Sequence, residues 1–119
     1  MPEDPAEVVQ RQLDAYNAHD IEGWLATYAP DARQYEYPDK LLAQGHAAMR
    51  ERMIQRFAEP DLHAHLMSRI VIGGTVIDHE AVARTFPEGA GTVEMVAIYQ
   101  VAAGRIVSAT FIIGNKQLS

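Results

Sequence analysis

Hydrophobic residues recur every three or four positions in the first half of the chain and at every second position in the second half. The first spacing places apolar side chains on one side of a helix, as for Val9, Leu13 and Tyr16. Asp4 and Asp20 precede two such stretches, where aspartate side chains cap the free N–H groups of a helix start. The pattern predicts helices over residues 4–19, 21–28 and 46–57, with a short strand over residues 32–38.

Beyond Pro60 the period of two predicts strands that short turns connect. Gly73-Gly74 and Ala103-Gly104 are typical of hairpin turns. The expected strands cover residues 62–72, 75–86, 92–102 and 105–113. The pattern predicts an α+β fold, in which three N-terminal helices pack on a strongly curved antiparallel or mixed sheet. The whole chain, residues 1–119, is expected to form one domain.

The last two predicted strands are apolar on both faces. Ala97 and Tyr99 lie on one face of their strand, while Val96 and Ile98 lie on the other. A sheet with one face in water would carry polar residues at alternate positions. We therefore expect one face to lie against the helices and the other against a second copy of the chain, in a homodimer formed through the sheet.

Composition limits the classes of partner. The 119 residues carry a net charge of −6, and the pI is about 5.2, which argues against nucleic acid and anionic membranes as partners. The chain has no cysteine, so disulfides and thiolate chemistry are excluded. No apolar run is long enough to cross a membrane, and the acidic start does not resemble a signal peptide. A soluble, cytoplasmic protein without metal or cofactor is the expectation.

Several segments together resemble a known group of proteins. They are "VVQRQLDAYNAHDIEGWLATYAPDA", "YEYP", "GHAAMRE" and "GRIVSATFIIGNK". They are similar to the nuclear-transport-factor-2-like superfamily, in particular to its ketosteroid-isomerase and SnoaL-like branches. The resemblance spans residues 5–116 and implies a cone-shaped fold, in which three helices close over a bent sheet and leave an apolar pocket.

The catalytic residues of the isomerase branch do not carry over. Its helix tyrosine corresponds to Gln12, and its protonated aspartate corresponds to Ala97. Its base corresponds to Glu36 or Tyr37, because this chain has one additional residue before Pro38. The resemblance therefore predicts the fold and not ketosteroid isomerisation by that mechanism.

The stretch Asp78-His79-Glu80 poses a question of direction, because neighbouring residues of a strand point to opposite faces. If Gly73-Gly74 is a two-residue turn, Arg69 lies opposite Asp78, and Ser68 lies opposite His79. With the more apolar face turned toward the helices, the acids form outer ion pairs and His79 points into the pocket. It is then either a core histidine bonded to Ser68 or a catalytic group that titrates near neutrality. A bulge of one residue would instead place Asp78, Glu80 and Val82 inside.

The candidate site follows from the first of these registers. His79 is the candidate for proton transfer, Glu36 is the alternate base, and Tyr28 or Tyr16 is expected to steady a substrate oxygen. Structural roles compete with each of these, since buried tyrosines often belong to the core and Glu36 is more simply a solvated strand residue. The expected ligand contacts are Tyr16, Trp24, Tyr37, Met53, Met95, Ala97, Tyr99 and Phe111. The helix face "RERMIQR" is expected to be solvated.

Three hypotheses of function remain open. The first is an enzyme that performs acid–base chemistry on a hydrophobic organic substrate, as an isomerase, cyclase, dehydratase or hydrolase. The second is a protein that binds a small apolar molecule without converting it. The third is a dimeric interaction module with a vestigial pocket. A pocket in which His79 is hydrogen-bonded to a buried carboxylate favours the first. A pocket lined only by Met, Ile, Tyr and Trp favours the second, and one filled by its own side chains favours the third.

Overall fold

The computed structural model describes residues 4–119. Three helices and six strands follow one another as α1 (Pro5–Asn17), α2 (Ile21–Ala26), β1 (Tyr28–Glu36), β2 (Lys40–Gln44), α3 (Gly45–Phe57), β3 (His63–Ile72), β4 (Thr75–Phe86), β5 (Gly89–Ala102) and β6 (Arg105–Leu118). The fold is α+β, as the sequence predicts.

The first two helices begin where the sequence places their caps. The Asp4 side chain accepts a hydrogen bond from the Ala6 N–H at 2.9 Å, and that of Asp20 accepts one from the Gly23 N–H at 3.0 Å. A Cβ at Gly23 would come within 2.4 Å of the Asp20 carboxylate, so a larger residue there would displace the capping side chain. The second helix is shorter than predicted, because Tyr28 is already the first residue of β1.

The six strands form one open, mixed sheet in the order β2-β1-β6-β5-β4-β3. All neighbours are antiparallel except β1 and β6, which run parallel. β2 was not predicted, and it places two strands between α2 and α3. All three helices lie in the first half of the chain, but two strands instead of the one predicted separate α2 from α3. The strong curvature expected for the sheet stays a prediction.

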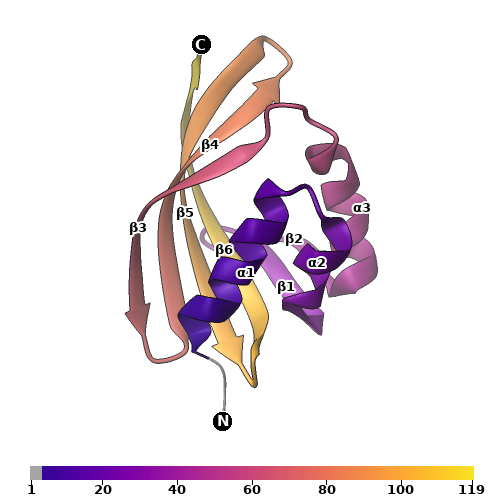
Figure 1. The fold of residues 1–119 in the computed structure, drawn as a ribbon, viewed down its shortest axis with the longest axis vertical. Coiled ribbons are helices and arrows are strands. Elements are labelled where there is room, and N and C mark those ends of the chain that lie inside the picture. The colour runs from indigo at the N-terminus through magenta and orange to yellow at the C-terminus, as the bar shows by residue number, and fades with distance from the viewer. Residues whose placement is uncertain (1–3) are drawn as a thin grey trace.

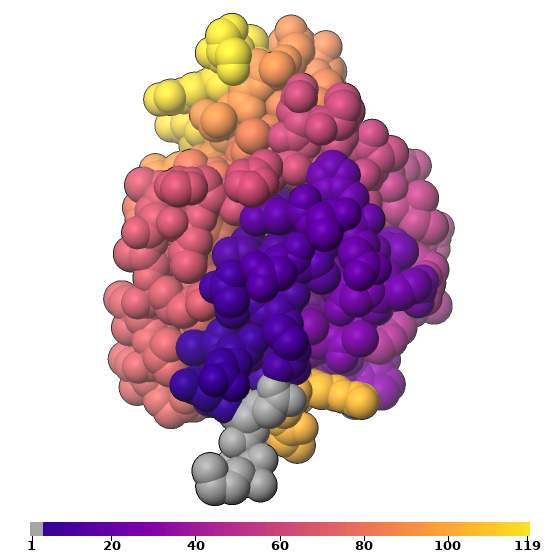
Figure 2. Space-filling model, in the orientation of Figure 1, coloured from indigo at the N-terminus to yellow at the C-terminus, as the bar shows by residue number. Residues whose placement is uncertain are grey.

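The helices are distributed along the sheet (Figure 1). α1 crosses in front of the long strands and contacts β3, β4, β5 and β6, whereas α3 packs on β1 and β2. α2 bridges the other two helices. In the view of Figure 2 the helices leave uncovered the end of the sheet where β4 turns into β5 and where β6 ends. The core lies between helices and sheet and includes Val8, Val9, Trp24, Tyr28, Met49, Val76 and Ile106, all at most 2% exposed.

The register of the β3–β4 hairpin determines which side chains face this core. Arg69 pairs with Asp78, and Ser68 pairs with His79, as the sequence predicts. A bulge at Met67 then shifts the register, so that Glu80 lies opposite Leu66 instead of Met67.

Within residues 4–119 no helix has the length and apolar character needed to cross a membrane.

Candidate functional site

A cavity of about 80 Å³ lies between the helices and the sheet. Its walls come from the three helices and from every strand except β2. They are formed by Gln12, Leu13, Tyr16, Trp24, Tyr28, Gln34, Arg52, Met53, Arg56, Ala64, Glu80, Val82, Arg84, Val93, Met95, Tyr99, Phe111 and Ile113. The volume is about half that of an engineered cavity that admits benzene, about 150 Å³. It therefore suits a small ligand, or a larger one if the flexible side chains in the wall move.

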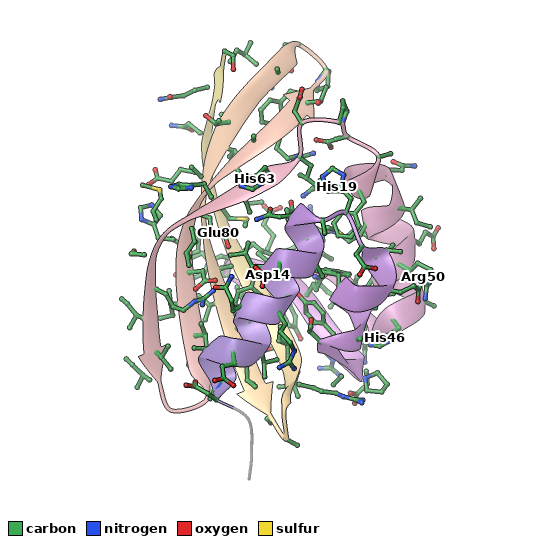
Figure 3. The ribbon with its side chains drawn as sticks, viewed as in Figure 1. Asp14, His19, His46, Arg50, His63 and Glu80 are labelled. Atoms are coloured by element: carbon green, nitrogen blue, oxygen red, sulfur yellow. The ribbon has the colours of Figure 1, made fainter. Side chains whose placement is uncertain are left out.

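β4 supplies an acidic side chain to the cavity because every second residue of this strand is buried. Val76, Asp78, Glu80 and Val82 are at most 2% exposed, while the residues between them are partly exposed. The period of two therefore places both carboxyl groups on the helix side of the sheet. Figure 3 shows Glu80 pointing from β4 toward the interior.

Arg69 and Asp78 form a buried ion pair. Arg69 donates from Nε to Oδ1 at 2.7 Å and from Nη2 to Oδ2 at 2.9 Å, and Asp78 is 0% exposed. A third bond runs from Arg69 Nη1 to the Gln10 side-chain oxygen at 3.0 Å. The guanidinium therefore satisfies both oxygens of Asp78, which is held as a structural carboxylate.

Glu80 has no such partner. It is 2% exposed, and its Oε2 atom is buried without a hydrogen bond to any of residues 4–119. Burial, and secondarily the negative charge of Asp78, raises the pKa of Glu80 to about 7, although Arg69 acts in the opposite direction. Both its protonated and its ionised forms are therefore populated near neutral pH, as a group that takes and returns a proton requires.

Three tyrosines surround the same space. Burial raises the pKa values of Tyr16, Tyr28 and Tyr99, so their hydroxyl groups stay protonated and available as donors. The Tyr28 hydroxyl is buried and makes no hydrogen bond of standard geometry with the described residues, although the nearby Gln34 side chain opposes the rise of its pKa. Such a group is costly to leave unpaired, and a ligand oxygen would satisfy it.

Aromatic packing and one hydrogen bond fix the cavity wall on the helix side, across from β4. The Trp24 ring lies 4.8 Å from that of Tyr28 and 5.8 Å from that of Phe57, measured between centroids. Trp24 Nε1 donates to the Gln12 Oε1 atom at 3.0 Å in the buried region. Gln12 therefore orients the indole, which gives this wall a fixed shape.

Arginines gather at another part of the wall. Arg84 donates to both oxygens of Glu59, at 2.9 and 2.8 Å, and Arg56 approaches the same carboxylate at 3.9 Å. Arg52 donates from Nη1 to the Gln34 Oε1 atom at 3.2 Å and to the Met53 sulfur at 3.5 Å. Burial lowers the pKa of Arg52, and the charge of Arg56 lowers it further. A guanidinium remains charged under all ordinary conditions, so Arg52 brings a positive charge to the cavity.

A family model describing the SnoaL-like domain matches residues 9–109. The chain belongs to the SnoaL-like family. This result confirms the predicted superfamily, and the structural neighbours agree on the fold. Comparison with curated protein sequences gives no match.

Three solved structures illustrate the range of proteins that this SnoaL-like domain resembles. An uncharacterized cystatin fold protein from Novosphingobium aromaticivorans is 23% identical, with a TM-score of 0.83 and coverage of 92% of this chain and 98% of that one. A putative SnoaL-like polyketide cyclase from Jannaschia is 17% identical, with a TM-score of 0.78 and coverage of 92% and 84%. AclR, a putative hydroxylase from Streptomyces galilaeus, is 18% identical, with a TM-score of 0.76 and coverage of 92% and 78%. At these identities the likeness establishes the fold.

The SnoaL-like domain does not direct His79 into its cavity, so that prediction of placement is wrong. The His79 side chain lies on the opposite face of β4, where Nε2 is 2.5 Å from Oε2 of the exposed Glu94. The pairing of Arg69 with Asp78 is as predicted, but the face with Asp78, Glu80 and Val82 is the one turned inside. Arg69 makes this possible, because it neutralises Asp78 on the buried side, and the apolar Ile70 is left 55% exposed on the other face.

The other predicted site residues divide into two groups. Tyr37 is 58% exposed, and neither it nor Glu36 contributes to the cavity wall, so their expected placement in the pocket is wrong. Ala97 is fully buried on the helix side of β5 but is not part of the wall. The remaining predicted site residues do form the cavity wall, and the role of these residues as ligand contacts stays a prediction. These are Tyr16, Trp24, Tyr28, Met53, Met95, Tyr99 and Phe111.

Sequence reasoning left Glu80 open as the alternative to His79, and it missed Arg52 and Arg56 as cavity residues. The two arginines directly precede Met53 and Phe57, which lie on the buried face of α3. They therefore lie at the edge of that face, and the sequence could have indicated that they reach the cavity. The expectation of a wholly solvated face is therefore wrong for them. Among residues 4–119 no group of three or more histidine, aspartate or glutamate side chains is arranged to hold a metal ion.

Proposed function

We propose that this SnoaL-like domain is a small-molecule enzyme in which Glu80 moves a proton on a largely apolar organic substrate. The buried Glu80 carboxyl, facing the cavity with one unpartnered oxygen and a pKa of about 7, carries the proposal. A structural carboxyl would be expected to have a cation or donor beside it, as Asp78 has in Arg69.

The chemistry that fits these groups is proton abstraction from a carbon next to a carbonyl. The Glu80 carboxylate accepts the proton, and the negative charge moves to the carbonyl oxygen as the enolate forms. The Tyr28 hydroxyl is buried and unpartnered, and it donates a hydrogen bond to that oxygen. Glu80 then returns the proton to another carbon, or the enolate carbon attacks a second carbonyl of the substrate and Glu80 gives its proton to the alkoxide that forms. The outcome is isomerisation in the first case and ring closure in the second.

Two features of the surroundings support this role. Burial keeps water away from Glu80, so the carboxylate is a stronger base than an exposed glutamate. Trp24, Met95 and Phe111 provide apolar contacts for the body of a substrate. The similarity to a putative polyketide cyclase is consistent with such chemistry.

The test uses a panel of small ketones in D₂O, in which NMR follows the replacement of α-hydrogens by deuterium. We expect Glu80→Gln to slow enzyme-dependent exchange by about 100-fold or more, because a general base typically contributes at least that factor. Glu94→Gln is the matched control, since it removes an exposed carboxyl from the other face of the sheet. His79→Gln should also leave exchange unchanged.

If the Glu80→Gln variant exchanges deuterium at the wild-type rate, Glu80 takes no part in the mechanism. A domain that binds members of the panel and exchanges none of them would favour the alternative of a binding protein without turnover. If only the His79→Gln variant loses exchange, the proton transfer takes place on the outer face of β4, where His79 lies.

A further inference from the structure

The positive charge inside the cavity exceeds what its carboxylates neutralise. The chain carries a net charge of −6, yet Arg52, Arg56 and Arg84 all line this one cavity. Glu59 accepts two hydrogen bonds from Arg84 and lies 3.9 Å from Arg56, so one carboxylate is shared by two guanidinium groups. Arg52 is left over.

Arg52 has only neutral partners. Both of its hydrogen bonds leave from Nη1, one to the Gln34 side-chain oxygen and one to the Met53 sulfur. Within residues 4–119 no carboxylate lies within ion-pair distance of it. A partly desolvated cation without a counter-charge is unfavourable, and an anion that enters the cavity removes that cost.

Glu80 does not supply the missing charge. The charged groups that act on its carboxyl are Asp78 and Arg69, both on the sheet, whereas Arg52 belongs to α3 and acts on Tyr28 and Tyr16. The cavity thus has a proton-transfer group on the β4 side and an unmatched cation on the α3 side. A substrate that spans the two would be oriented by its charge.

We propose that the cavity binds a small organic molecule with one carboxylate group, which pairs with Arg52 beside Arg56. The proposal rests on the proposed function in placing the reacting carbon near Glu80. A guanidinium presents a planar fork of N–H donors that matches the two oxygens of a carboxylate. One uncommitted cation matches a single negative charge, while a doubly charged phosphate would leave one charge unpaired in a confined space. The substrate is therefore an acid whose remainder is apolar.

The experiment compares acids with amides of the same shape. Acetate, butyrate and benzoate are titrated against acetamide, butyramide and benzamide, and binding is followed by shifts of cavity amide signals in NMR spectra. We expect at least one acid to bind the wild-type domain at least 10-fold more tightly than its amide. Equal affinities, or no binding by any acid, would overturn the proposal without reference to any variant.

Variants then assign the preference to Arg52. Arg52→Met should bring the acid-to-amide ratio close to one, while Arg52→Lys should retain part of it. Arg50→Met is the matched control: Arg50 lies on the same helix, faces outward and pairs with the exposed Glu22 (Figure 3). An unchanged ratio in Arg52→Met, or a reduced ratio in Arg50→Met, would contradict the assignment. Tighter binding of inorganic phosphate than of every acid would replace carboxylate by phosphate as the ligand group.

The same assay separates this inference from the proposed function. Glu80→Gln is expected to keep the preference for acids, because Arg52 is intact. Loss of proton exchange with a normal acid preference supports both proposals. A normal acid preference, with exchange independent of Glu80, would overturn the proposed function and leave the carboxylate site standing.

Discussion

Arg69 binds Asp78 through two parallel hydrogen bonds. Asp78 lies two residues before Glu80, on the same buried face of β4. The arginine fully engages one carboxyl and leaves the other without a partner among residues 4–119. Two acids of the same strand thereby acquire different properties: Asp78 is a structural anion, and Glu80 is a group that titrates near neutrality.

Glu80 should make the stability of the fold depend on pH. Its pKa is raised from 4.5 to about 7 in the folded state, so folding favours the protonated form. The stabilising contribution is fully present below pH 4.5 and is lost as pH rises through 7; complete loss corresponds to about 3 kcal/mol. Urea unfolding between pH 4 and about 9 should therefore show wild type losing stability relative to Glu80→Gln. Parallel curves for the two proteins would mean that the carboxyl has an ordinary pKa.

The pair of Arg69 and Asp78 should be strongly coupled. A cross-strand pair on a solvated face would contribute below about 1 kcal/mol, but Asp78 is fully buried. Arg69→Met leaves that carboxylate without its cation, and we expect a loss of about 3–5 kcal/mol. A double-mutant cycle with Asp78→Asn, measured by chemical denaturation, should give a coupling free energy above about 2 kcal/mol. Arg50→Met, at an exposed pair that solvent screens, should cost far less, and an equal loss in both variants would argue against burial as the cause.

We expect the outer face of the sheet to form a homodimer. Its apolar rows follow from the observed register, in which Ile70 pairs with Ile77, Ile77 with Ile98, and Val96 with Ile112. The residues predicted to lie in the interface are Val96, Ile98, Ser108 and Ile112. Ile98→Asp should shift the species seen by analytical ultracentrifugation from dimer to monomer, because it places an unpaired charge in the contact.

Ile54→Asp is the matched control for the dimer. Ile54 is an exposed apolar residue of α3, on the helix side of the sheet and therefore away from the proposed contact. The control should remain dimeric. A wild-type domain that sediments as a monomer at micromolar concentration would leave the apolar outer face without its expected cover.

Much of the fold was accessible from sequence because its signals are local. The aspartate caps of α1 and α2 and the Gly73-Gly74 turn each specify a few neighbouring residues, and the structure confirms them. β2 was missed because its five residues are too few to display a period. Where such short elements occur, only tertiary contacts identify them.

The face of β4 was predicted incorrectly for a physical reason. The choice rested on placing the more apolar side of the hairpin inside, and it undervalued a buried ion pair. Arg69 compensates Asp78 well enough for the charged side to face the helices, and the unbroken period of two along β4 places Glu80 on the same side. Since a strand has a period of two, this single choice reversed the positions of His79 and Glu80 together.

The place of β6 in the sheet has a consequence for folding. β6 lies between β5 and β1, and its parallel neighbour β1 is far away along the chain, so their pairing requires closure of a long loop. Until β1 pairs with β6, the hairpin of β1 and β2 is not joined to β3–β6, and the wall around Glu80 lacks Tyr28 and Gln34. Water then reaches the carboxyl, which titrates as an ordinary glutamate. The raised pKa of Glu80 should therefore appear only when this pairing joins the two parts of the sheet.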